Sequence, residues 1–249
     1  SVMGSRDIGE LNQKLNLRLT GSVNSEEGHI SSISKDDKLL FIENLARMRQ
    51  ISLESQWHDA DDVVGWFELE RFSNGLRLFK KDRLLIDYTD MLQMFLDRGR
   101  APKLDVMFVD EAQDLSPLQW AVVRKLCESA DRVYIAGDDD QAIYRWAGAD
   151  VDYLIRNSKD AMVLKQSYRI PSSVHTIAQR CIGQVASRVH KVWQPKKEVG
   201  HVSWEPSYES IDMEHGEWLV LARTNYLLNG IEEHCRSEGW FYKSKNRTS

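Results

Sequence analysis

The chain has 249 residues with a formal net charge of −5, and 42% of its residues are hydrophobic and 29% charged. This balance is typical of a globular protein, so it excludes a disordered tail, a fibrous repeat and a coiled-coil rod as the main content of the chain. We expect no transmembrane helix and no signal peptide, and the three widely spaced cysteines fit neither a disulfide framework nor a zinc site, so we expect a cytoplasmic protein.

Residues 1–100 are predicted to be mostly helical. The start of the chain is polar and weakly patterned, and it leads to Ser34, a predicted helix N-cap. Apolar residues then recur at helical spacing over 39–48, 57–72 and 84–96. A glycine and a proline follow the last of these segments and are predicted to stop it.

From about residue 101 the pattern changes to strands that alternate with helices. Two short apolar runs, at 104–109 and 132–137, are predicted to be buried strands because they are too short for helices. Further candidate strands lie at 161–164, 201–204 and 218–222, and the helices between the strands are predicted at 117–126, 174–185 and 227–235. This alternation predicts a parallel sheet of the α/β class.

The charges are unevenly distributed along the chain. Residues 161–197 contain seven Lys and Arg residues and no Asp or Glu, whereas acidic residues gather at 59–62, 105–114 and 138–140. A basic stretch opposite an acidic one suits a site that holds a polyanion together with a metal ion. The alternative is that the charges segregate by chance on solvated faces, and on charge alone we favour that alternative.

The first motif, VDEAQD, follows the predicted strand that ends at Val109. Ligands of open α/β sheets bind at this edge, and an Asp at position 110 can hold Mg²⁺ directly or through water. The adjacent Glu111 can orient or deprotonate an attacking water. A solvated acidic loop after a strand is an equally good interpretation of this motif alone.

The second motif, GDDDQAIYRWAGAD, begins at Gly137 after the next predicted strand. Gln141 can accept from water and donate to a phosphate oxygen, so it can sense a terminal phosphate. Tyr144 and Trp146, with an arginine between them, can stack on nucleic-acid bases. The alternatives are a calcium-like acidic loop and, for at least one aromatic ring, packing in the core.

The third motif, KQSYR, follows the candidate strand at 161–164. Arg169 can clamp a phosphate and Tyr168 can stack on a base. Taken alone this signal is weak, because most Tyr-Arg pairs are surface contacts.

Together these segments resemble a known family. DEAQD, GDDDQAIYRWAGA, KQSYR and LARTN, which begin at Asp110, Gly137, Lys165 and Leu221, occur in the order of motifs II, III and IV and the following DNA-contact motif of UvrD/Rep-type superfamily 1 DNA helicases. The segment DYTDML at 87–92 is also similar to that family.

The resemblance implies an α/β fold with two RecA-like P-loop NTPase domains, parallel sheets and an all-helical inserted subdomain. Residues 1–100 would form most of that inserted subdomain. Residues 101–158 would form the C-terminal part of the first RecA-like domain, and residues 159–249 the start of the second.

The same resemblance implies roles for individual residues, with ATP and Mg²⁺ as cofactors. Asp110 is similar to the Mg²⁺ ligand, Glu111 to the catalytic base, Gln141 to the γ-phosphate sensor and Arg169 to the arginine finger. Tyr168 is similar to the residue that stacks on adenine. The remaining matches correspond to residues that contact single-stranded DNA: Tyr144, Trp146, Arg223, Thr224 and Asn225.

The sequence departs from the family in four ways. It contains no G-x-x-x-x-G-K-[ST] loop, no upstream glutamine motif and nothing that resembles the late motifs with further nucleotide and DNA contacts. In addition, Ala147 stands where close relatives often carry Arg. We therefore expect a central fragment of an ATP-dependent helicase that moves 3′ to 5′ on single-stranded DNA and unwinds duplex junctions in repair or replication, inactive as an ATPase on its own. The alternative is a degenerate, non-catalytic DNA-binding or protein-interaction module.

Overall fold

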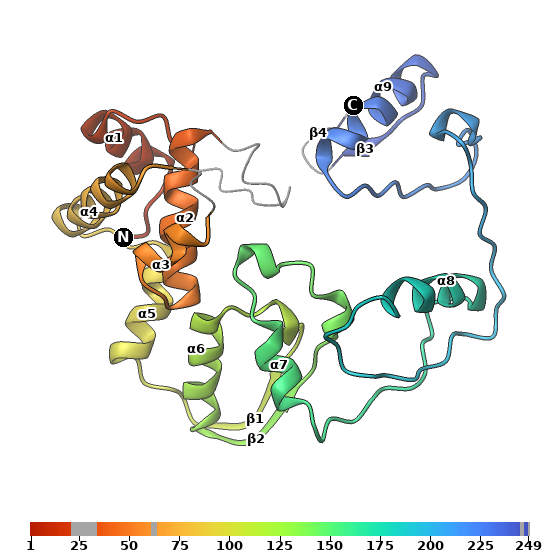
Figure 1. Cartoon of the computed structure of the whole chain (residues 1–249), viewed down its shortest axis with the longest axis horizontal. Helices are drawn as coiled ribbons and strands as arrows, with labels where there is room; N and C mark the ends of the chain where they lie inside the picture. The colour runs from red at the N-terminus through yellow and green to blue at the C-terminus, as the bar shows by residue number, and fades with distance from the viewer. Residues whose placement is uncertain (21–33, 61–63, 245–246, 249) are drawn as a thin grey trace. The chain divides into compact units, whose positions relative to one another are not determined.

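The computed structural model of the chain describes residues 1–20, 34–60, 64–244 and 247–248. Its contacts divide it into two compact units (Figure 1). The first unit consists of residues 1–161 and 187–190, and the second consists of residues 162–186 and 191–249. Each unit is described by itself.

The described part of the first unit begins with five helices, where the sequence predicts a mostly helical region but only three helical segments, and the first helix was not predicted. They are α1 (Ser5–Leu15), α2 (Lys35–Arg49), α3 (Leu53–His58), α4 (Trp66–Arg83) and α5 (Tyr88–Arg98). Helix α2 contacts α3, α4 and α5, and α1 packs on α4. Their apolar faces form one hydrophobic core, which contains the buried residues Leu11, Leu19, Leu39, Phe41, Ile42, Leu45, Ala60, Val64, Leu69, Phe72, Leu76, Phe79 and Leu85.

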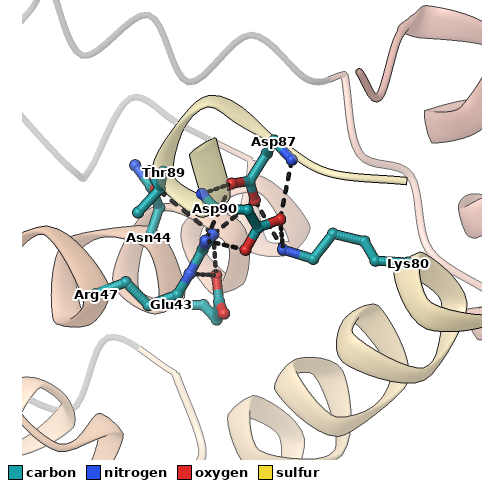
Figure 2. A network of polar contacts seen from close by, with 7 residues as sticks. All are labelled: Glu43, Asn44, Arg47, Lys80, Asp87, Thr89 and Asp90. Atoms are coloured by element: carbon teal, nitrogen blue, oxygen red, sulfur yellow. Dashed lines mark hydrogen bonds and ion pairs between the residues drawn. The ribbon is translucent and has the colours of Figure 1, made fainter. Parts of the chain in front are cut away.

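A network of charged side chains ties α2, α4 and the start of α5 together (Figure 2). The guanidinium of Arg47 lies 2.9 Å from Glu43, 2.8 Å from Asp87 and 3.1 Å from Asp90. The ammonium of Lys80 lies 2.9 Å from Asp87 and 2.7 Å from Asp90. Two cations therefore hold the capping box that begins α5, in which Asp87 accepts from the backbone of Asp90 and Asp90 from that of Asp87.

Helix boundaries agree with the sequence where a local cap sets them. Ser34 caps α2 by accepting from the backbone N–H of Asp37, as predicted. The predicted helix at 57–72 is wrong in one respect, because α3 ends at His58 and α4 begins only at Trp66. The predicted helix at 84–96 is also wrong at its start, because Leu84 ends α4 in the left-handed conformation and α5 begins at Tyr88.

Two parallel strands follow, and the sequence predicts a strand at each place, although the second begins at Ala130 rather than at Arg132. The prediction that both strands are buried is wrong, because Met107 is the only residue of the two that is buried. The two strands are β1 (Leu104–Val109) and β2 (Ala130–Ile135), joined by a crossover through α6 (Pro117–Cys127). Figure 1 shows α6 and α7 (Val151–Asn157) on the same side of this pair. Side chains alternate between the faces, so Met107 is buried whereas Phe108 and Tyr134 stack on each other with 76% and 52% of their surfaces exposed.

The second unit contains α8 (Ser172–Ile182), α9 (Asn229–Ser237) and a short antiparallel pair, β3 (Lys243–Ser244) and β4 (Arg247–Thr248). The strands predicted at 161–164, 201–204 and 218–222 do not form. A strand requires a neighbour that bonds to its backbone, and the described residues supply no such neighbour to these segments. Apolar side chains in them accordingly stay exposed, among them Leu164, Trp204 and Leu221.

The fold is thus mixed α/β and mostly helical, with one small parallel pair of strands in the first unit. None of the helices in the described ranges combines enough length and apolar character to span a bilayer.

Candidate functional site

The first candidate residues lie at the carboxyl end of β1. Asp110 directly follows the strand, is exposed, and accepts a 2.9 Å hydrogen bond from the backbone N–H of Glu111. Glu111 has a left-handed backbone, with φ 50° and ψ 41°, which is uncommon outside glycine. Two neighbouring carboxylates therefore lie directly after the strand.

Gln113 connects this turn to the end of β2. Its side chain is 2% exposed, although it carries a fully polar amide. The amide nitrogen donates to Glu111 Oε2 at 2.7 Å, and the amide oxygen accepts from the backbone N–H of Asp138 at 2.9 Å. If the amide were flipped, its oxygen would face the carboxylate of Glu111 and its NH₂ group would face the backbone N–H of Asp138. Neither pair can form a hydrogen bond, so the two contacts fix the orientation of the amide.

Gly137 makes room for this connection. A Cβ atom at this position would lie 2.9 Å from Gln113 Oε1, 2.9 Å from a methyl group of Leu154 and 3.2 Å from the backbone nitrogen of Ala112. Ala112 itself donates to the carbonyl of Ala136 at 3.0 Å. The two strand ends therefore approach each other at a point where only glycine fits without displacement.

The loop after Gly137 positions Gln141. Asp138 accepts from the backbone N–H of Asp140 at 3.2 Å and from the side-chain amide of Gln141 at 2.7 Å. Hydrogen bonds therefore run from Glu111 through Gln113 and Asp138 to Gln141. The structure brings two of the predicted catalytic residues into one connected network.

Asp114, the last residue of DEAQD, lies beside this network. Burial raises the pKa of its carboxyl, and the negative charge of Glu111 raises it further. One of its oxygens, Oδ1, is buried without a hydrogen-bond partner among the described residues. Asp114 is therefore an acidic side chain held in an environment that disfavours its charge.

The two aromatic residues of the second motif lie between this network and the helical core. Trp146 is half-buried and stacks on Phe41 of α2, with ring centroids 6.5 Å apart and an interplanar angle of 20°. Tyr144 is 42% exposed and lies 6.3 Å from the Trp146 ring. Trp146 therefore takes part in core packing, and whether it also stacks on a base stays a prediction.

A returning segment of the chain holds the same loop from another direction. Arg188 donates to both oxygens of Asp140, at 2.7 and 2.6 Å, and the backbone N–H of Val189 donates to Asp139 at 2.7 Å. This is why residues 187–190 belong to the first unit although their neighbours in sequence belong to the second.

The second unit contains Tyr168 and Arg169. Ser167 accepts from the backbone N–H groups of Arg169 and Ile170, at 3.3 and 3.2 Å, and so forms a tight turn. Both candidate side chains are exposed, and the ring of Tyr168 is 83% accessible. Their predicted contacts with nucleotide stay predictions.

The predicted DNA-contact segment also lies in the second unit. Arg223 is exposed, and Thr224 is buried with a hydroxyl that has no hydrogen-bond partner among the described residues. The side chain of Asn225 lies outside the described part of the chain. The DNA role of these three residues stays a prediction.

The donor chemistry of the first site suits a magnesium ion. Mg²⁺ prefers one or two carboxylates with water and phosphate oxygens, and exposed Asp110 and Glu111 offer such ligands. The carboxylate oxygens of Asp138, Asp139 and Asp140 also lie within 4.8 Å of one another. These three already accept hydrogen bonds from the loop and from residues 188–189, so we assign no ion to them.

Sequence reasoning missed three residues of this site: Gln113, Gly137 and Arg188. Gln113 stands inside the DEAQD motif, and Gly137 opens the second motif, so their motifs were found but not their functions. Arg188 was counted only as one of seven basic residues. No local signal reveals a partner 48 residues away, which is the separation of Arg188 from Asp140.

Comparison with known proteins gives a consistent result. The model of the UvrD/REP helicase N-terminal domain matches residues 18–162. The ATP-dependent DNA helicase PcrA of Bacillus subtilis is 32% identical over 126 residues, which cover 48% of this chain and 16% of the relative. DNA helicase II of Escherichia coli is 29% identical over 141 residues, covering 54% of this chain and 19% of the relative.

A probable DNA helicase II homolog of Rickettsia felis is 24% identical over 236 residues, which cover 80% of this chain. The aligned part spans 35% of that relative. The chain therefore matches between about one sixth and one third of the length of these relatives.

Proposed function

The chain belongs to the family of the UvrD/REP helicase N-terminal domain, and on that premise we propose that it supplies the water-activating part of an ATP-dependent DNA helicase. In this proposal the first unit is part of a RecA-like domain with a helical subdomain inserted into it. The phosphate-binding loop, which the 249 residues do not contain, is supplied from outside them. The complete enzyme means these residues together with that loop.

One observation carries the proposal. Glu111 and Gln141, which the resemblance assigns to water activation and to sensing of the terminal phosphate, are joined by hydrogen bonds through Gln113 and Asp138. Acidic loops that are merely solvated do not need a buried amide between them. The connected geometry therefore favours catalysis over a degenerate binding module.

The residues of the chain would act as follows. Asp110 holds the magnesium ion, and Glu111 accepts a proton from the attacking water. Gln141 would contact the terminal phosphate, and Arg169 would stabilise charge on the transferred phosphoryl group. When bound, ATP would supply that phosphoryl group and Mg²⁺ would neutralise part of its negative charge.

The DNA-binding part of the proposal involves other residues. Tyr144 and Trp146 stack on bases of single-stranded DNA, and Arg223, Thr224 and Asn225 contact the strand. The names of the relatives from Bacillus subtilis and Escherichia coli support DNA as the partner. Movement in the 3′ to 5′ direction and unwinding of duplex junctions belong to the same proposal.

The test is the ATPase activity of the complete enzyme with and without single-stranded DNA. DNA should stimulate hydrolysis, and Glu111→Gln should reduce kcat by roughly 10²–10⁴-fold because the general base is removed. Hydrolysis that is absent from the wild type, with DNA binding retained, would favour the non-catalytic module instead.

A further inference from the structure

Gln113 uses both ends of its amide within the site. It donates to the carboxylate of Glu111 and accepts from the backbone of Asp138, at 2.7 and 2.9 Å. The side chain is almost completely buried, so its amide is shielded from water. A buried amide with both ends satisfied has one stable orientation and restrains the groups that it bonds.

The surroundings of Gln113 are built to keep it there. Gly137 provides the space in which the amide oxygen lies, since a Cβ atom would approach that oxygen to 2.9 Å. The backbone of Ala112, beside Gln113, bonds to the carbonyl of Ala136 at 3.0 Å. The amide is thus fixed at the point where the ends of β1 and β2 meet.

The bond to Glu111 restrains only one carboxylate oxygen. Gln113 engages Oε2, which leaves Oε1 as the oxygen that can face an attacking water. Glu111 has a left-handed backbone and an exposed side chain, so without this bond its carboxylate would rotate freely in solvent. A general base acts efficiently only when it is held within hydrogen-bond distance of the proton that it removes.

We propose that Gln113 is a positioning residue, which orients the Glu111 carboxylate and fixes the loop of Asp138 and Gln141 against it. This inference rests on the proposed function, because it assigns a role toward the same reaction. Gln113 acts through Glu111 and Gln141 and takes no proton itself. A movement of Gln141 on binding or loss of the terminal phosphate would thereby reach Glu111 through Asp138 and the side chain of Gln113.

Gln113→Glu in the complete enzyme separates positioning from simple structural support. The variant keeps the acceptor for the backbone of Asp138 but replaces the donor to Glu111 with a second carboxylate. The two like charges repel each other, so the Glu111 carboxylate is no longer held in place. We expect kcat to fall about 10–100-fold with KM for ATP within about threefold.

The matched control is Gln93→Glu. Gln93 also donates to a carboxylate, that of Asp97 at 2.8 Å, but it lies exposed on α5 away from the strand ends. This variant should leave both kcat and KM for ATP unchanged. If Gln113→Glu does not fold, Gln113→Met keeps the side-chain length without either bond and should also lower kcat while KM stays within about threefold.

A wild-type kcat in Gln113→Glu, or an equal change in its kcat and its KM for ATP, overturns the positioning role. For Gln113→Met, a wild-type kcat or an equal change in kcat and KM does the same. Full turnover in Glu111→Gln instead overturns the proposed function itself, so the two failures are distinguishable.

Discussion

The guanidinium of Arg188 holds the carboxylate of Asp140 through two hydrogen bonds, of 2.7 and 2.6 Å. Both side chains are only 14% exposed. The hydrogen bonds to Asp140 raise the pKa of Arg188. A bidentate pair of this kind is directional as well as strong, and here it fixes the loop that carries Gln141.

We therefore expect Arg188→Gln to lower the free energy of unfolding by about 1.5–3 kcal/mol, the range of hydrogen bonds to charged groups. Thermal or urea unfolding of the chain measures this change. Arg156→Gln is the control, because Arg156 lies 3.8 Å from Asp150 and its side chain is 64% exposed. That variant should change stability by no more than about 1 kcal/mol. Equal losses in both variants would contradict a special role for the Arg188–Asp140 pair.

Acid should weaken the helical part of the chain through Asp87. Burial raises the pKa of Asp87, but the hydrogen bonds and charge of Arg47 and the bond from Lys80 outweigh it, so the pKa lies well below its usual range. A carboxyl with a lowered pKa stabilises the fold above its unfolded pKa of about 3.9, and this contribution is lost as pH falls further. Thermal melts measure this loss of stability when they run from about 2 pH units below the unfolded pKa to about 3 units above it.

Asp87→Asn should destabilise the chain by about 1–3 kcal/mol at neutral pH and should flatten the acid limb of its stability curve. Glu43 offers a contrast, because burial raises its pKa against the attraction of Arg47. A carboxyl with a raised pKa adds stability as pH falls, which partly offsets the loss from Asp87. Glu43→Gln removes this offset, so the free energy of unfolding should fall more steeply in acid. Parallel stability curves for Asp87→Asn and the wild type would count against the network as the source of the pH dependence.

Gly137→Ala should lower stability by about 1–3 kcal/mol, the usual cost of overpacking. The added methyl group would lie 2.9 Å from Gln113 Oε1 and from a methyl group of Leu154, and the amide of Gln113 is held by hydrogen bonds at both ends. Gly9→Ala in α1 is the matched control, since a Cβ there meets nothing within 4 Å. It should stabilise the chain by about 0.5–1 kcal/mol through helix propensity, and both changes can be followed by thermal melting.

Trp146→Ala tests core packing and base stacking in one variant. The ring is half-buried against Phe41, so we expect a stability loss of about 2–3 kcal/mol, below the ~3–5 kcal/mol of fully buried rings. In the folded fraction of the complete enzyme, affinity for single-stranded DNA should fall by about 1–3 kcal/mol. Trp204, which is 84% exposed, is the control for stability. Unchanged DNA affinity would restrict Trp146 to packing.

Substitution of Arg169 and substitution of Tyr168 should affect different kinetic quantities in the complete enzyme. Arg169→Ala should reduce kcat by roughly 10³–10⁵-fold with nucleotide binding largely retained, because it acts on transition-state charge. Tyr168→Ala should instead weaken nucleotide binding through lost stacking. Steady-state kinetics with a fluorescent ATP analogue separates the two effects, and Arg180→Ala, exposed on α8, is the control. Similar effects of the two variants on nucleotide affinity would contradict the assigned roles.

Local signals explain which parts of the fold could be predicted. Ser34 caps α2 through its own hydroxyl three residues away, so the sequence alone predicts that helix start. Strands β1 and β2 contain short apolar runs that pair with each other, so the sequence predicts both strands but not their exposure. The candidate strand at 218–222 has the same composition but no neighbouring strand among the described residues, and composition cannot reveal that difference.

The site shows the same division. Asp110, Glu111 and Gln141 stand in motifs that can be read along the chain. The link between those motifs is a contact between Gln113 and Asp138, which are 25 residues apart. The stack of Trp146 on Phe41 likewise spans two elements that only the folded chain brings together. Long-range contacts of this kind depend on how helices and strands pack, which a single sequence does not specify locally.

The stacked rings of Phe108 and Tyr134 have a practical consequence for anyone who purifies the chain. They form an aromatic face on a pair of parallel strands, a kind of sheet that usually has both faces covered. A solvent-facing aromatic surface binds hydrophobic dyes and favours self-association at high concentration. Replacing both rings with threonine, which keeps strand propensity, should improve solubility without touching the network of Gln113.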